Sequence, residues 1–380
     1  MAKTYAEINE KIKNGTAVVL TAEEVSELAK TCSPKEIAEK VDVVTTATFG
    51  AMCSSGAFLN FGHANPPIRM EKIELNGIRV CGGLAAVDTY IGATECNPEN
   101  PTYGGAHLIE DLIAGKEITL EAWGKGTDCY PRKHIKTVIS KETINEAYLY
   151  NPRNAYQNYN VATNSTDKIK YTYMGTLLPK LRNASYSTSG ELSPLLNDPE
   201  CRTIGLGTRI FLCGAEGYVA WNGTQFHSTK ETNTHGIPTS NARTLAVIGD
   251  LKNMSTDFIR GVYYEKYGVS LFVGIGIPIP ILDEDLARRV SIRNEQIETT
   301  IIDYGDNNKV LGKTNYAALQ SGEIELNGQK IRTAPVSSLS KAREIASILK
   351  EWIEKGDFLL TEPVRPMPVG TSLKSLKEQE

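Results

Sequence analysis

The strongest constraint on the fold comes from Asn-Gly pairs that stand between short runs of alternating apolar and polar residues. They occur in I-E-L-N-G-I-R-V at 73–80, Y-V-A-W-N-G-T-Q-F at 218–226 and I-E-L-N-G-Q-K-I at 324–331. Such a pair predicts a two-residue turn between antiparallel strands, because both residues tolerate the positive φ angles that the turn requires. The shared pentapeptide I-E-L-N-G is too short to indicate a duplication. The chain is therefore expected to contain β-hairpins.

Helix signals are interspersed with these hairpins. Capping boxes at Thr21–Glu24 and Ser33–Glu36 predict two short helices before the β-branched run V-D-V-V-T-T-A-T-F. Amphipathic patterns predict three later helices, over 106–115, from Asp283 onward, and over 337–356. The fold class is therefore predicted as α/β or α+β, with a mixed sheet, β-hairpins and flanking helices.

With 380 residues the chain is expected to form one large catalytic domain, 1–362, either single with insertions or built of two packed lobes. The polar segment 151–193 is predicted to be a surface excursion or a lid, and 363–380 a poorly ordered tail. The apolar run Val269–Leu282 is interrupted by glycines and prolines and is too short for a membrane span, so a buried strand and loop is expected there.

Charge and cysteine usage narrow the functional classes. A net charge of -4 argues against nucleic-acid binding. The amino end lacks the apolar core of a signal peptide, so the mature chain is expected to start there and to be cytoplasmic. Seven cysteines without a secretory signal fit reduced thiols in that compartment. No C-x-x-C pair, Walker motif, G-x-S-x-G or H-E-x-x-H is present, so no metal and no cofactor is predicted from spacing.

The first candidate reactive thiol is Cys129, in W-G-K-G-T-D-C-Y-P-R-K-H at 123–134. Lys125, Arg132, Lys133 and His134 surround it in sequence. Cations near a thiol stabilise the thiolate, which is the nucleophilic form. Glycines and a proline mark a shaped loop, although an incidental surface cysteine remains an alternative interpretation of the same residues.

The second candidate is Cys53, in G-A-M-C-S-S-G-A at 50–57, directly after the β-branched run. Small neighbours leave the thiol uncovered, and successive backbone N–H groups in such a turn can bind an anion. The following F-G-H-A-N-P-P-I-R supplies His63, Asn65 and Arg69, which offer a proton carrier near neutral pH and a carboxylate-binding guanidinium. The alternative is a small buried hydrophobic residue at a strand end.

The stretches T-T-A-T-F-G-A-M-C-S-S-G-A-F-L-N-F-G-H-A-N-P-P-I-R, A-A-V-D-T-Y-I-G-A-T-E, G-G-A-H-L-I-E-D-L-I-A-G-K and G-K-G-T-D-C-Y-P-R-K together resemble the homocysteine-biosynthesis family of L-aspartate semialdehyde sulfurtransferases of methanogens and other anaerobes. The similarity covers about the first 360 residues. It implies synthesis of homocysteine from L-aspartate semialdehyde and a sulfide or persulfide donor, with electrons from a ferredoxin-like protein. The family's two functional cysteines match Cys53 and Cys129, and its persulfide carrier matches Cys129. Many members continue into a pair of CBS domains after the catalytic region, whereas this sequence ends at Glu380, so regulation through that module is expected to be absent or supplied elsewhere.

A mechanism follows as a hypothesis. The Cys129 thiolate accepts sulfane sulfur, and the persulfide attacks the aldehyde. Cys53 then attacks the S–S bond, which leaves a Cys53–Cys129 disulfide that an external reductant must open. His63 or His134 is assigned as the acid, and Arg69, Arg132, Lys133 and Asn65 are assigned to substrate binding.

Two alternatives remain open at this point. One is a sulfur-trafficking or thiol redox-sensing protein without small-molecule turnover. The other is an iron–sulfur or metal-binding scaffold built from Cys53, Cys81, Cys96 and Cys129. A homo-oligomer is compatible with both alternatives and with the enzyme.

Overall fold

The structure is a computed structural model that describes residues 2–378. Its largest sheet has the order β1-β2-β18-β14-β15-β16-β9-β3-β6, and β17 also pairs with β18. The strands of this sheet are β1 (Val19–Thr21), β2 (Val43–Ala51), β3 (Gly56–Asn60), β6 (Asp88–Gly92), β9 (Glu146–Asn154), β14 (Arg209–Leu212), β15 (Ala215–Asn222), β16 (Leu245–Asp250), β17 (Ile259–Tyr264) and β18 (Gly268–Pro280). Only β1 and β2 run parallel within it, which confirms the predicted mixed sheet.

Strands β2 and β18 form the centre of this sheet. They pair antiparallel along nine residues of each, from Phe272↔Ala51 to Pro280↔Val43. Both are almost entirely buried, and the buried hydroxyl of Thr45 donates to the carbonyl of Ala346 in the covering helix α8 (Leu339–Glu354). The predicted buried strand in the apolar run is therefore confirmed as β18.

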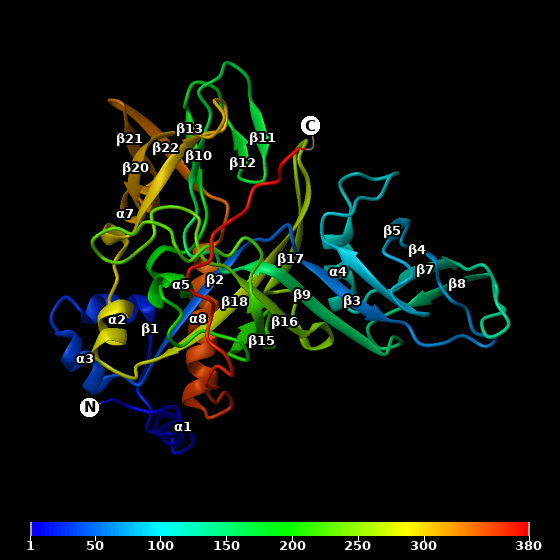
Figure 1. The fold of residues 1–380 in the computed structure, drawn as a ribbon, viewed down its shortest axis with the longest axis horizontal. Helices are drawn as coiled ribbons and strands as arrows, with labels where there is room; N and C mark the ends of the chain where they lie inside the picture. Colours follow the sequence, from blue (N-terminus) through cyan, green and yellow to red (C-terminus); the bar gives the residue numbers. More distant parts are fainter. Residues whose placement is uncertain (1, 379–380) are drawn as a thin grey trace.

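The remaining helices lie around this sheet, except α7, which packs against the six-stranded sheet described below (Figure 1). They are α1 (Tyr5–Lys13), α2 (Ala22–Leu28), α3 (Pro34–Lys40), α4 (Gly105–Ile113), α5 (Pro194–Asn197), α6 (Glu284–Val290) and α7 (Tyr316–Gln320), with short 3-10 turns at Gly190–Leu192, Leu251–Asn253 and Asn294–Gln296. Thr21 and Ser33 cap α2 and α3 as the sequence predicts. Helix α6 ends at Val290, whereas the amphipathic pattern that begins at Asp283 continues to Ile297.

A four-stranded sheet extends from one side of the molecule, at the right of Figure 1. Its order is β5-β4-β7-β8, from β4 (Lys72–Leu75), β5 (Ile78–Val80), β7 (Ile118–Trp123) and β8 (His134–Ile139). Asn76 and Gly77 join β4 to β5 with φ angles of 48° and 77°, as their hairpin sequence predicts. The inner side chains of this sheet, such as Ile73 and Leu120, belong to the main core.

A six-stranded sheet with the order β20-β19-β10-β13-β22-β21 lies at the upper left of Figure 1. Its strands are β10 (Val161–Thr163), β13 (Asn183–Tyr186), β19 (Glu298–Asp303), β20 (Lys309–Asn315), β21 (Glu323–Leu326) and β22 (Gln329–Pro335); β11 (Lys170–Thr172) and β12 (Gly175–Leu177) form a separate hairpin. The β21–β22 hairpin is the one predicted at 324–331. The hairpin predicted at 218–226 is not formed, because β15 ends at Asn222 and Gly223 donates to the carbonyl of Thr244.

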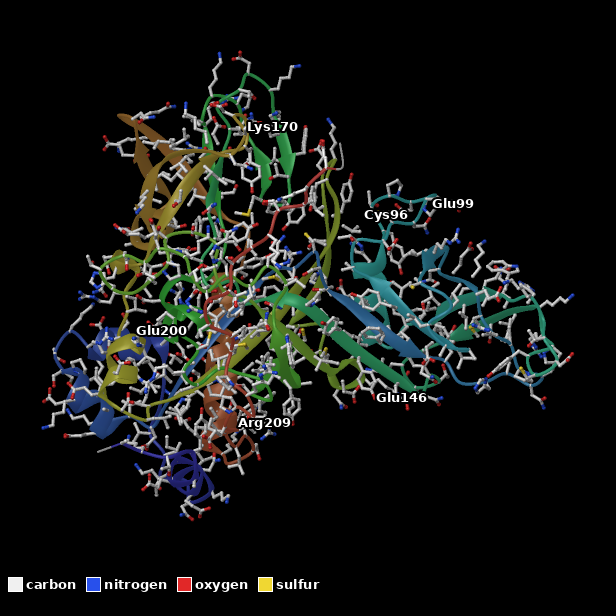
Figure 2. All side chains as sticks on the ribbon, viewed as in Figure 1. Cys96, Glu99, Glu146, Lys170, Glu200 and Arg209 are labelled. Carbon is white, nitrogen blue, oxygen red and sulfur yellow. The ribbon has the colours of Figure 1, made fainter. Side chains whose placement is uncertain are left out.

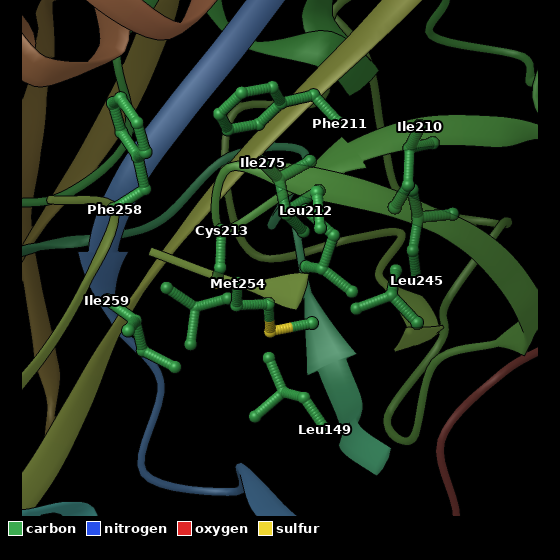
Figure 3. Packing of buried hydrophobic residues seen from close by; sticks show 14 of the residues in the cluster. Leu149, Ile210, Phe211, Leu212, Cys213, Leu245, Met254, Phe258, Ile259 and Ile275 are labelled. Atoms are coloured by element: carbon green, nitrogen blue, oxygen red, sulfur yellow. The ribbon is translucent and has the colours of Figure 1, made fainter. Parts of the chain in front are cut away.

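The main hydrophobic core fills the space between the largest sheet and its helices. Figure 3 shows part of it, where Met254 lies among Leu149, Leu212 and Leu245 beside the buried Cys213. Burial raises the pKa of the Cys213 thiol to about 12, so this thiol stays protonated and acts as a small apolar side chain.

The polar segment 151–193 contributes strands β10 to β13, and several of its amide side chains are fully buried. Asn158, for example, donates to the carbonyls of Pro238 and Glu298. Its movement as a lid stays a prediction. In the segment after Glu362, Arg365 bridges to Leu206, and Thr371 donates its N–H to Ser228.

Candidate active site

Cys53 lies in the turn that joins β2 to β3 in the largest sheet. The turn is braced by Ser55, whose N–H and hydroxyl both donate to the carbonyl of Met52, at 3.0 and 2.7 Å. Asn151 on β9 donates to the Ser55 hydroxyl at 2.8 Å. These bonds hold the thiol in a fixed position at the end of a buried strand.

Two hydroxyl groups from the β17–β18 hairpin face the sulfur. The buried Ser270 donates its hydroxyl to Cys53 Sγ at 3.3 Å, and Tyr267 Oη lies 3.8 Å from the same atom. Cys53 itself is half-buried. A partly accessible sulfur with two hydroxyl groups beside it suits a reacting thiol better than packing filler.

The thiol opens into a cavity of about 330 Å³, a volume that suits a small metabolite. Four tyrosines, Tyr156, Tyr159, Tyr173 and Tyr267, line it with the apolar side chains of Ala51, Met52, Met174 and Val336. Polar contacts are offered by Ser54, Ser187, Gln225 and Arg153. Arg153, at the end of β9, is the one charged side chain among these lining residues.

The phenols around the cavity remain neutral donors. Burial raises the pKa of Tyr156 to about 12, against the opposing effect of the Arg153 charge. Burial raises the pKa of Tyr264 to about 12 as well, and the neighbouring charge of Cys53 adds to the effect. The pKa of Tyr267 is raised by the same two causes in the same order. Each phenol therefore keeps its proton at neutral pH.

A group of three hydrogen-bonded tyrosines lies between this cavity and a second cavity of about 640 Å³. Tyr159 donates to Tyr173 at 3.1 Å, and the hydroxyls of Tyr173 and Tyr304 lie 2.6 Å apart. Tyr159 and Tyr173 line both cavities. The tyrosine-rich segment 151–193 thus supplies most of the cavity's aromatic wall.

Cys129 lies elsewhere, in the loop 124–133 between β7 and β8 of the four-stranded sheet. The loop is closed by reciprocal backbone bonds between Thr127 and Tyr130, and Thr127 Oγ1 lies 3.5 Å from Cys129 Sγ. The thiol is exposed. Lys133 packs against Gly126, and Lys125 Nζ lies 3.7 Å from Glu71 Oε1. Within residues 2–378 no hydrogen bond joins these cations to Cys129 Sγ, so their effect on the thiol stays a prediction.

His63, Asn65 and Arg69 join the Cys129 loop rather than Cys53. Arg132 donates its guanidinium to the carbonyl of Asn65 at 2.8 Å and its N–H to that of Pro67. The ring of His63 stacks on Tyr130 with centroids 6.1 Å apart. The main-chain carbonyl of Arg69 lies directly over Gly124, where a Cβ would come within 2.2 Å of it. The chain after β3 therefore carries these residues across to the four-stranded sheet.

His134 is the first residue of β8 and is held by its own sheet. Its Nε2 lies 3.0 Å from Glu121 Oε1, and its ring lies 5.4 Å from that of Trp123. Hydrogen bonds from His134 and Lys136 lower the pKa of Glu121. His134 is therefore part of a surface ion-pair group near the Cys129 loop.

The sequence-predicted residues thus fall into two groups. Cys53 lies at the cavity of the largest sheet. The other seven gather on the four-stranded sheet: Cys129, His63, Asn65, Arg69, Arg132, Lys133 and His134. Figure 1 shows the β7–β8 end of the four-stranded sheet well away from the β2–β3 turn. No hydrogen bond within residues 2–378 connects the two thiols.

Sequence reasoning missed the groups that surround Cys53. Ser270 and Tyr267 come from a hairpin more than 200 positions away, and no local pattern connects them to the thiol. Arg153 and Tyr156 belong to the polar segment 151–193, whose tyrosine content was the one available signal.

The other cysteines fall into buried and accessible classes. All seven are free thiols. Cys96 lies on the exposed loop before α4 (Figure 2), and Cys81 is exposed as well, whereas Cys201 and Cys213 are buried. Among the described residues no group of three or more His, Cys, Asp or Glu side chains is placed to hold a metal ion. In the same range, every helix is too short or too polar to cross a bilayer.

A half-buried thiol with hydroxyl donors, opening into a small cavity with one cation, is an arrangement that suits cysteine chemistry on a small molecule. Comparison with known proteins agrees with that class. Residues 17–360 match the family described as homocysteine biosynthesis enzyme, sulfur-incorporation, and the chain belongs to it.

Three relatives align with most of this chain, at identities between 28% and 52%. An L-aspartate semialdehyde sulfurtransferase of Methanosarcina acetivorans is 49% identical over 382 residues, which cover 100% of this chain and 74% of that protein. One of the same name from Methanocaldococcus jannaschii is 52% identical, over 95% of this chain and 72% of that protein. An uncharacterized protein of Methanothermobacter thermautotrophicus is 28% identical, over 84% of this chain and 72% of that protein. No solved structure matches the chain.

Proposed function

We propose that this enzyme is a sulfurtransferase that forms homocysteine from L-aspartate semialdehyde, with the carbon chemistry at the Cys53 cavity and sulfur acquired at Cys129. Family membership and the names of two relatives near 50% identity support the reaction. The observation that carries the assignment of the cavity is the Cys53 thiol in its wall, with hydroxyl donors at 3.3 and 3.8 Å.

The chemistry balances as follows. A Cys129 persulfide adds to the aldehyde carbon, which gives a hydroxyalkyl disulfide on Cys129. Attack by Cys53 on the cysteine-bound sulfur releases the substrate as a hydroxy-thiol and leaves a Cys53–Cys129 disulfide. Loss of water gives a thioaldehyde, and two electrons with two protons reduce it to the thiol. Two further electrons with two protons reopen the disulfide, and a ferredoxin-like donor supplies all four.

The scheme needs a proton donor at each thiol, and a different residue is available at Cys53 than at Cys129. Tyr267 lies at Cys53 and keeps its proton at neutral pH, so it supplies a proton to the developing alkoxide of the substrate. His63 and His134 lie with Cys129, and there they assist the transfer of sulfane sulfur from a persulfide donor to the Cys129 thiol. The cations Arg69, Arg132 and Lys133 serve to bind the carboxylate of a substrate brought to Cys129, and the carbonyl of Asn65 fixes the Arg132 guanidinium.

The two thiols must meet for the exchange step. Since their loops stand on different sheets, this proposal requires that the Cys129 loop moves or that Cys129 of a second copy serves Cys53. The chain's seven free thiols also fit work in a reducing cytoplasm.

Homocysteine formation from L-aspartate semialdehyde, a persulfide donor and reduced ferredoxin tests the function. Cys53→Ala is expected to lower the rate at least about a thousandfold, as loss of a nucleophile does, and Cys129→Ala to abolish transfer from a persulfide donor. Cys96→Ala removes an exposed thiol outside both groups and serves as the matched control. Full activity in the Cys53→Ala protein would refute the assignment of the cavity.

An equal mixture of Cys53→Ala and Cys129→Ala chains separates the two routes for exchange. If Cys129 of one copy serves Cys53 of another within a dimer, random pairing restores about a quarter of the parent rate. If the loop moves within one chain, the mixture stays inactive.

A further inference from the structure

Arg153 is fixed beside Cys53 by the backbone. It is the second-last residue of β9, its N–H donates to Asn151 Oδ1 at 2.9 Å, and its carbonyl accepts a 3.4 Å hydrogen bond from the hydroxyl of Ser54. Ser54 is the direct neighbour of the reacting thiol in the chain. The backbone of Arg153 is therefore hydrogen-bonded to the same β2–β3 turn that carries Cys53.

The Arg153 side chain lacks a counter-charge of its own. Its Nε is buried and has no hydrogen-bond partner, and no ion pair within residues 2–378 includes it. None of the residues that line the cavity is acidic. A buried guanidinium N–H without a partner is costly, whereas a planar carboxylate can accept two such N–H bonds together.

We propose that Arg153 is the carboxylate anchor of the Cys53 cavity and that the site selects short aldehydes by this one charge. The inference rests on the proposed function and names the contact by which the substrate is recognised. The amino group of the substrate meets only neutral acceptors, such as Ser54, Ser187 and Gln225. The carboxylate therefore dominates recognition, and an aldehyde that keeps it but lacks the amino group still binds.

Alkylation of Cys53 reports on this anchor without turnover. Iodoacetate and iodoacetamide deliver the same carbon to a thiolate, and only iodoacetate carries the carboxylate. The rate ratio of the two reagents at Cys53, read by mass spectrometry and divided by their ratio at free glutathione, is expected to be about ten, the factor that ~1.4 kcal/mol of added binding gives. The exposed Cys81 and Cys96 of the same chain serve as internal references.

Three variants make the test specific. Arg153→Gln is expected to reduce the normalised ratio to about one while iodoacetamide still labels Cys53, and Arg153→Lys is expected to retain part of it. Arg182→Gln removes an equal charge at an exposed position outside the cavity and is expected to leave the ratio unchanged. A parent ratio near one, or a ratio that survives in Arg153→Gln, would overturn the anchor.

The same design separates this inference from the reaction itself. Succinate semialdehyde, which has the carboxylate and lacks the amino group, is expected to protect Cys53 from iodoacetamide in the parent at about tenfold lower concentration than in Arg153→Gln. Butanal, which has neither group, is expected to protect both proteins equally. Protection that ignores Arg153 refutes the anchor even if homocysteine is formed, and absence of homocysteine with a preserved ratio refutes the reaction alone.

Discussion

The hydrogen bond from Ser270 to Cys53 gives the sharpest test of the site's electrostatics. Ser270→Ala removes one oxygen from a fully buried position of β18 and leaves the strand's packing otherwise intact. A hydrogen bond to a charged group contributes about 1.5–3 kcal/mol. At 3.3 Å to a sulfur atom, a weaker acceptor than oxygen, the lower end of this range applies.

A loss of about 1.4 kcal/mol of transition-state stabilisation corresponds to a tenfold lower rate. The expected result is therefore about tenfold slower alkylation of Cys53 by iodoacetamide at pH 7, followed by mass spectrometry of the Cys53 peptide. Tyr267→Phe is expected to slow alkylation only about twofold, because its oxygen lies 3.8 Å away and the bond is correspondingly weaker.

Ser187→Ala is the matched control, since it removes a hydroxyl from the same cavity and Ser187 has no hydrogen bond to the thiol. An alkylation rate in Ser270→Ala within twofold of the parent would contradict the argument that this hydroxyl supports nucleophilic attack by the Cys53 sulfur. A fall in Ser187→Ala as large as in Ser270→Ala would show that the cavity's general polarity, and not this bond, controls the thiol.

Two further predictions concern pH. Burial opposes the charge of Asp42, but hydrogen bonds from Lys11, the N–H of Val18 and Lys3 outweigh it and lower the pKa of that carboxyl. The contribution of Asp42 to stability is therefore present above its unfolded-state pKa near 4 and is lost as the pH falls through its folded-state pKa. Asp42→Asn should lower the free energy of unfolding, measured with urea, by about 1–3 kcal/mol at pH 7. The same substitution should lower it by much less near pH 3. Tyr156 and Tyr264, with pKa values raised to about 12, should stabilise the fold below pH 10 and lose that contribution between pH 10 and 12; replacing either with Phe should leave the absorbance rise at 295 nm below pH 11 unchanged, and a smaller rise would contradict their burial.

Local sequence chemistry predicted the local elements well. The capping boxes at Thr21 and Ser33, the Asn76–Gly77 turn and the apolar strand β18 all depend on residues within one or two turns of each other. The failed prediction at 218–226 shows the limit, because Gly223 bonds to Thr244, which is distant in sequence and outcompetes the local turn.

The family, the two cysteines of the resemblance and the cations near Cys129 could all be read from the amino-acid sequence, because cations and thiol lie within ten residues there. Which groups lie beside which thiol depends on the fold. Segment 61–69 leaves β3 and packs on the Cys129 loop, so His63, Asn65 and Arg69 lie on the four-stranded sheet.

Cys53 instead receives partners from β9 and the β17–β18 hairpin, which sheet pairing brings together from positions 153 to 270. Ser270, Tyr267 and Arg153 carry no motif, since a hydroxyl, a phenol and a guanidinium acquire their roles only from where the sheet places them. The hydrophobic pattern of a strand sets its register, but no local pattern says that β18 pairs with β2 or that β9 pairs with β3, because these strands lie far apart in sequence.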